Sequence, residues 1–122
     1  MPNILIDHSP VVADIVASTR LAQVLHRAVI DTGVFPTWGI RTFVRAAEES
    51  LVADATQDQG FIQIMVRIAP GRTPEVRAQV LERLFDAVDG VLGPHLETRK
   101  FGYQLEITEF DKAFTRNRNN LA

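Results

Sequence analysis

The chain has 122 residues, a length that suits one domain, and its 46% hydrophobic and 23% charged residues are close to the average of globular proteins. The net charge of −2 gives no electrostatic basis for binding nucleic acid or an anionic membrane, and the absence of cysteine excludes disulfides and thiolate metal sites. No apolar run approaches the ~18–20 residues that span a membrane, and the first residues lack the basic and long apolar regions of a signal peptide, so we expect a cytoplasmic protein.

The chain begins Met1-Pro2, and an apolar run follows at once. Removal of Met1 would leave Pro2 with a free secondary amine at the chain terminus. An α-amino group titrates near pH ~8, and desolvation or a nearby cation lowers its pKa further. A neutral amine at the end of a rigid strand can act as a general base. Proline at position 2 is also common, so the pattern alone leaves an ordinary N-terminus as the alternative.

Four stretches of alternating side chains predict β-strands, because β-branched and aromatic residues are frequent in them. The predicted strands are residues 4–8, 40–46, 61–68 and 103–108. Two apolar stripes at helical spacing predict helices of near-equal length. The first helix runs from about Val11 to Asp31. The second begins at Thr73, which can cap it, has Pro74 in its first turn, and ends at Gly93-Pro94.

The order of elements is therefore β-α-β twice, at about 2–46 and 61–109, within a single domain of residues 1–122. Each unit is expected to be a right-handed crossover with parallel strands. The predicted class is α/β (α+β): a four-stranded mixed sheet with two helices on one face. Residues 48–60 are predicted to form a loop with at most a short edge strand. The tail, residues 111–122, can cap a site or fray, and partial order is predicted.

Three apolar side chains are predicted to project from the sheet face that the helices leave open. They are Phe43, Phe61 and Met65. The sequence offers no third layer to cover them, so we expect another subunit to do so.

Two arginines are candidates for binding carboxylates, which a guanidinium holds through a planar fork. Arg41 lies at the start of the second strand, which in a parallel unit begins beside Pro2; the alternative is a solvated strand arginine. Arg72 precedes the second helix, where free N–H groups favour anions; the alternative is a surface arginine beside a cap. His8, His26 and His95 lack ligand spacing, so no metal site is predicted.

Several segments together resemble one family. Thr32-Gly33-Val34-Phe35-Pro36-Thr37-Trp38-Gly39-Ile40-Arg41 looks like the T-G-[IV]-F-P-x-x-G-I-R run of the 5-carboxymethyl-2-hydroxymuconate Δ-isomerase family, in the tautomerase superfamily. Ile68-Ala69-Pro70-Gly71-Arg72 is similar to its segment ending in G-R, and Glu106-Ile107-Thr108-Glu109 and Asn119-Asn120 also fit. The similarity extends over nearly the whole chain. Asn3, His8 and residues 44–57 differ from the pattern.

The resemblance implies a cofactor-free isomerase that assembles as a homotrimer. It implies that Pro2 is the general base and that Arg41 and Arg72 bind substrate. The implied substrate is a carboxylated dienol from aromatic catabolism, in the breakdown of homoprotocatechuate and 4-hydroxyphenylacetate, and the implied reaction moves a proton from the 2-hydroxy side to carbon 5.

Two alternatives remain open at this point. The same scaffold can serve another reaction, such as tautomerisation of a phenylpyruvate-like enol or hydration of an unsaturated acid. The chain can also be a non-enzymatic oligomeric binding module. The sequence leaves undecided the exact substrate, the removal of Met1, the role of the tail and the subunit that supplies each arginine.

Overall fold

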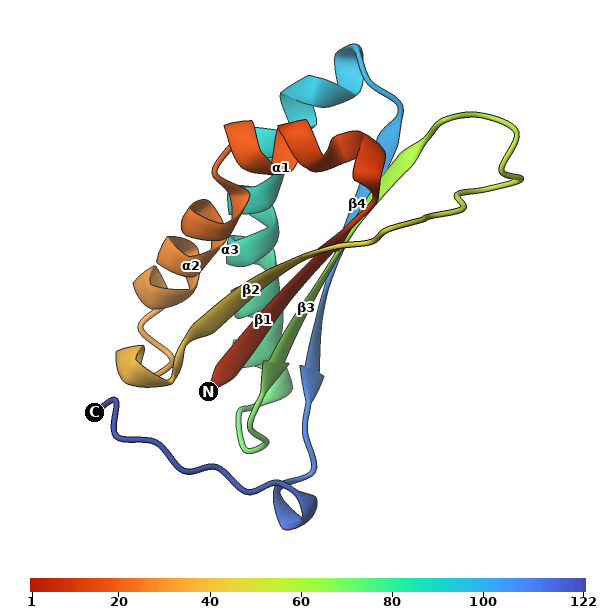
Figure 1. The fold of residues 1–122 in the computed structure, drawn as a ribbon. Helices are drawn as coiled ribbons and strands as arrows, with labels where there is room; N and C mark the ends of the chain where they lie inside the picture. The colour runs from red at the N-terminus through yellow and green to blue at the C-terminus, as the bar shows by residue number, and fades with distance from the viewer.

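The computed structural model describes residues 1–122 as one sheet with its helices on a single face (Figure 1). The elements are β1 (Pro2–His8), α1 (Ala13–Ser18), α2 (Leu21–Asp31), β2 (Arg41–Ala46), β3 (Gly60–Ile68), α3 (Pro74–Leu92) and β4 (Phe101–Glu109). Short 3-10 turns occur at Pro10–Val12, Thr37–Gly39, Gly93–Glu97 and Lys112–Phe114. None of the helices is both long and apolar enough to span a bilayer.

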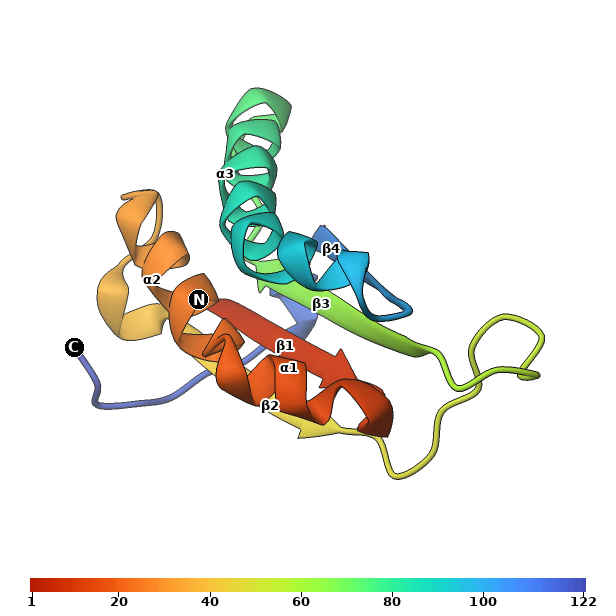
Figure 2. The same cartoon turned by 90° about the horizontal axis from the view of Figure 1, so that it is seen from above.

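The sheet has the strand order β2-β1-β3-β4. β1 runs parallel to β2, β3 runs parallel to β4, and the two units join through the antiparallel pair of β1 and β3. The predicted fold class, a mixed four-stranded sheet built from two β-α-β units, is therefore confirmed. The helices α2 and α3 lie side by side against the sheet (Figures 1 and 2).

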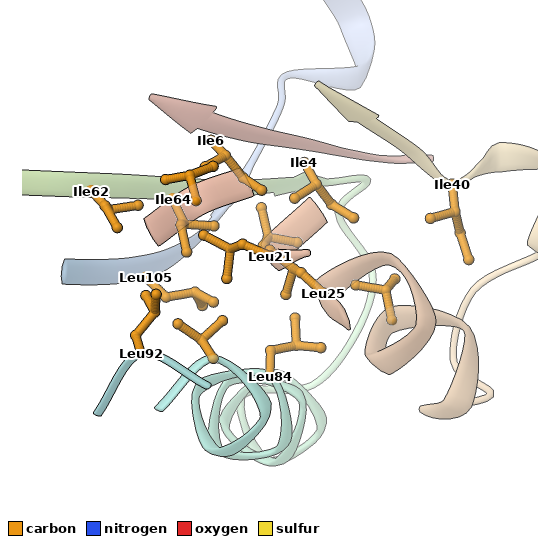
Figure 3. Close-up of a cluster of buried hydrophobic side chains, with 14 of the residues drawn as sticks. Ile4, Ile6, Leu21, Leu25, Ile40, Ile62, Ile64, Leu84, Leu92 and Leu105 are labelled. Carbon is orange, nitrogen blue, oxygen red and sulfur yellow. The ribbon is translucent and has the colours of Figure 1, made fainter. Parts of the chain in front are cut away.

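The core lies between the sheet and the helices, because β1 and β3 alternate strictly between buried and more accessible side chains. Figure 3 shows Ile4, Ile6, Ile62 and Ile64 directed from the sheet toward the helical layer, where they meet Leu84 of α3. These five side chains have no exposed surface. Burial of apolar area on this one face is the main contribution to folding stability.

The prediction of one long first helix is wrong. The segment forms two helices of 6 and 11 residues, which meet at an angle, while α3 has 19 residues. Thr19 Oγ1 donates to the Ile15 carbonyl at 2.7 Å, and Arg20 adopts a left-handed φ of 53°. A side-chain hydroxyl that bonds a backbone carbonyl competes with the helical pattern, and a left-handed residue ends the helix. The break lets α1 and α2 pack on different parts of the sheet.

The second helix begins and ends where the sequence predicts. Thr73 Oγ1 accepts a hydrogen bond of 3.2 Å from the Val76 amide, and Pro74 opens the helix. Such a cap satisfies one of the N–H groups that the first turn leaves without a partner. After Leu92 the chain continues as the 3-10 turn Gly93–Glu97.

Two segments extend beyond the layers. Residues 47–59 form a loop without a strand that projects away from the body (Figures 1 and 2). The tail after β4 makes the turn Lys112–Phe114 and then runs back past the ends of the strands to the N-terminus (Figure 1). There Asn117 Nδ2 lies 3.2 Å from Met1 Sδ. The tail therefore closes over the edge of the sheet at which β1 begins.

We expect Leu84→Ala to lower the free energy of unfolding by about 2–5 kcal/mol, because it leaves a cavity between α3 and the sheet. Urea denaturation followed by circular dichroism measures this loss. Leu51→Ala is the matched control, since Leu51 is 77% exposed in the projecting loop and its truncation should change the value by less than about 0.5 kcal/mol. Equal effects of the two substitutions would contradict the assignment of the core.

Candidate active site

The start of β1 lies at the centre of one edge of the sheet. Asn3 is directly opposite Arg41 of parallel β2, and Pro2 is opposite Ile68 at the end of antiparallel β3. The pairing therefore places Arg41 beside the N-terminus, as the parallel unit predicts. Pro2 itself is buried.

Gly39 allows the chain terminus to lie close to the turn that precedes β2. A Cβ atom built on Gly39 would collide with the amine nitrogen of Met1, whereas its next neighbour outside Met1, Pro36 Cγ, is at an ordinary contact distance of 3.7 Å. The terminal amine therefore occupies the space that a side chain at position 39 would fill.

The terminal amine has a pKa below its ordinary value. Burial is the largest cause, because desolvation disfavours the ammonium form, and the positive charges of Arg41 and Arg72 add to it. A lowered pKa means that the amine loses its proton at a lower pH, so more of it is neutral near pH 7. The environment at this edge of the sheet thus shifts the protonation equilibrium of the amine toward its neutral form.

The two candidate arginines are held differently. Arg41 Nε donates to Asn3 Oδ1 at 2.9 Å, and the side chain is half-buried. Arg72 donates to the carbonyls of Ala69 and Val34 at 3.4 and 3.3 Å, and its guanidinium lies 4.6 Å above the ring of Phe35. Arg72 therefore also fixes the loops before β2 and α3, a structural role that its position in the sequence did not indicate.

A cavity of about 640 Å³ opens between the terminus, the sheet and the tail. The sheet contributes Asn3, Leu5, Arg41, Phe43 and Arg67, and the tail contributes Phe110, Asp111, Phe114, Thr115, Arg116 and Asn117, while Met1 lies at the side. Arg72 is near enough to act on the amine through its charge but does not line the cavity.

Sequence reasoning did not identify Arg67 as part of this cavity, and it left open whether the tail caps a site or frays. The alternation of β3 already put Arg67 on the face of Phe61 and Met65, and this was the available signal. The position of the tail depends on contacts between segments more than a hundred residues apart, such as that of Asn117 with Met1, and no local pattern encodes them.

Two of the three histidines have structural partners. His8 is buried and its Nδ1 lies 2.8 Å from the Ser9 carbonyl oxygen, and His26 on the flank of α2 is joined to Thr42 Oγ1 at 2.8 Å. No group of three His, Cys, Asp or Glu side chains is arranged to hold a metal ion. The polar groups available at the cavity are thus amine, amide, hydroxyl, guanidinium and one carboxylate, that of Asp111.

The paired β-α-β units form the fold of the tautomerase superfamily, and a partly buried terminal amine lies near two arginines at one edge of the sheet. The family model described as 5-carboxymethyl-2-hydroxymuconate isomerase matches residues 2–122, and the chain belongs to this family. It is 26% identical over 121 residues to the 5-carboxymethyl-2-hydroxymuconate Delta-isomerase of Escherichia coli, covering 99% of this chain and 96% of the relative.

Two solved structures share the fold. A 5-carboxymethyl-2-hydroxymuconate isomerase from Deinococcus radiodurans R1 superposes with a TM-score of 0.90 at 24% identity, over 98% of this chain and 90% of the other. A 5-carboxymethyl-2-hydroxymuconate delta-isomerase gives a TM-score of 0.89 at 24% identity, over 99% and 90%. The likeness therefore extends over both β-α-β units and the tail.

We expect Arg41→Gln to raise the pKa of the terminal amine, because one of the two cations that disfavour the ammonium form is removed. Burial remains as the largest cause, so the ordinary value should not be fully restored. The pH dependence of the rate at which the amine is acetylated, read by mass spectrometry of the N-terminal peptide, gives this pKa. Arg45→Gln is the control, since Arg45 on the same strand is paired with Asp7. An amine pKa that is the same in both variants would refute the electrostatic role of Arg41.

Proposed function

We propose that this protein isomerises a carboxylated 2-hydroxymuconate-type dienol, without a cofactor, and that Pro2 is its general base once Met1 has been removed. The observation that carries this proposal is the lowered pKa of the terminal amine, which in the structure belongs to Met1. This amine lies near Arg41, at the side of the cavity. As the resemblance implies, we place the enzyme in the cytoplasmic catabolism of homoprotocatechuate and 4-hydroxyphenylacetate.

The proposed reaction is a proton transfer through a dienolate. The neutral Pro2 nitrogen takes the proton of the 2-hydroxyl group. The electron pair left on oxygen forms the carbonyl at carbon 2, the double bond moves to carbons 3 and 4, and carbon 5 takes the proton back from Pro2. Positioned cations stabilise the negative charge that develops. Arg41 would supply this stabilisation while it binds a substrate carboxylate. Arg72 would add to the stabilisation through its charge.

Removal of Met1 is part of the proposal. With Met1 in place, the Pro2 nitrogen is an amide without basicity, and Met1 lines the cavity. Removal would transfer the terminal amine to Pro2, one residue further into β1, where Arg41 is opposite the next residue. A small residue such as proline at position 2 normally permits this cleavage.

We expect the intact mass of the native protein to lack one methionine and Pro2→Ala to lower kcat by about 10²–10⁴-fold, the usual contribution of a positioned general base. The loss of dienol absorbance follows the reaction. Gln79→Lys, an exposed substitution on α3 away from the cavity, is the control for handling and stability. An active enzyme that retains Met1, or an unaltered kcat in Pro2→Ala, would rule out the proposed base.

We also propose that the protein is a homotrimer in which neighbouring subunits cover the open sheet face outside the cavity. Phe61 and Met65 on this face do not line the cavity, and they are only half-buried in the single chain. Apolar side chains gathered on one face favour burial against another surface. A second copy of the chain presents a face of the same composition.

Light scattering at micromolar concentration should give the mass of three chains. Met65→Lys should shift the distribution toward monomers, because it brings an uncompensated charge into the covered face while lying outside the cavity lining. Gln79→Lys adds the same charge to the helical face and should leave the mass unchanged. A monomeric wild-type protein would disprove the assembly.

A further inference from the structure

Residues of the open sheet face form rows across the strands, because residues in register point to the same side. The row at the N-terminal edge, here called the edge row, contains Arg41, Asn3 and Arg67. The next row contains Phe43, Leu5 and Met65, and the third row contains Arg45, Asp7 and Gln63. The face therefore changes from cationic to apolar to polar along β1.

The edge row and the third row differ in one respect that matters for charge. In the third row Arg45 is neutralised by Asp7 through two hydrogen bonds of 2.7 and 2.9 Å. In the edge row the equivalent position of β1 is Asn3, a neutral amide, which accepts one hydrogen bond from Arg41. The two arginines of the edge row therefore flank a residue that cannot compensate either charge.

Arg67 is the arginine of the cavity whose guanidinium makes no ion pair and no hydrogen bond. Arg116 is bonded to the carbonyls of Ala113 and Thr115 in the tail. The carboxylate of Asp111 accepts from the Ala113 amide and caps the turn Lys112–Phe114. Asp111 thus has a local structural partner, and the exposed Arg67 side chain remains available to an anion.

We propose that Arg67 binds a second carboxylate of the ligand whose first carboxylate is held by Arg41. The ligand class is a conjugated dicarboxylate about six carbons long. Arg41 and Arg67 are two strand spacings apart, ~10 Å between backbones, and their long side chains can lean toward each other. Leu5 and Phe43 in the next row line the same cavity and offer an apolar surface to the hydrocarbon between the carboxylates. Asn3 is a positioning residue for Arg41.

This inference rests on the proposed function, and it adds a second recognition point in the same cavity. Two like charges that flank one strand of a sheet repel each other, and a dianion bound between them removes that repulsion. A monoanion compensates only one of the charges. The edge row should therefore distinguish dicarboxylates from monocarboxylates of the same shape.

The test compares trans,trans-muconate with sorbate, which has the same diene but a methyl group in place of one carboxylate. Isothermal titration calorimetry on the full-length, assembled protein should show muconate binding about tenfold or more tightly than sorbate, a difference of about 1.4 kcal/mol. Arg67→Gln should weaken muconate binding to about the level of sorbate and leave sorbate binding unchanged. Arg67→Lys, which keeps the charge, should restore part of the difference.

The control is Arg27→Gln, which removes an exposed arginine on α2, in the helical layer behind the open face. It should leave both affinities unchanged. Muconate affinity that is insensitive to Arg67→Gln, or an equal loss for both ligands, would overturn the assignment of Arg67. Binding of these non-reacting ligands does not depend on proton transfer. Failure of the Pro2 base would therefore appear in turnover, and failure of the Arg67 site would appear in the muconate-to-sorbate ratio.

Discussion

The in-register pairing of β1 with both of its neighbours determines where everything else in this site lies. β1 is parallel to β2 and antiparallel to β3, so its first residues meet the beginning of one strand and the end of the other. Three segments distant in sequence thus converge at one edge of the sheet: the chain terminus, the start of β2 with Arg41, and the end of β3 with Arg67. A shift of one residue in either pairing would turn these side chains toward the core.

The two faces of the sheet contribute differently: one to folding stability and the other to the charged groups of the cavity. The helix-facing side holds the fully buried residues shown in Figure 3, and it contributes the apolar burial on which folding depends. The open face can therefore keep charged groups whose repulsion costs stability. Asp7 neutralises Arg45 outside the cavity lining, whereas Asn3 does not compensate the charge of Arg41 near the terminal amine. The charge of Arg41, which lowers the pKa of the amine, is thus also available for an anionic ligand.

The sequence was informative where local pattern and chain direction decide the structure. The cap at Thr73 and the position of Arg41 beside β1 follow from such rules, and the structure has both. The break at Arg20 could not be read from the sequence, because the apolar stripe continues through it and a single hydroxyl at Thr19 helps to end the helix. The tail over the cavity and the loop contacts of Arg72 depend on tertiary neighbours, which single-sequence patterns do not specify.

Met1 and Gly39 link chain processing to the architecture of the cavity. The space beside Gly39 holds the amine of Met1. Met1 is also the only residue that a Cβ atom on Gly39 would collide with. A terminus beginning at Pro2 would vacate this space while Pro2 stays anchored opposite Ile68 by the sheet. The amine would then be a secondary amine, held in place by the proline ring and by strand pairing. It would lie next to Asn3, the residue that pairs with Arg41. Cleavage of one peptide bond would thus enlarge the cavity and create its base in the same step, without rearrangement of the sheet.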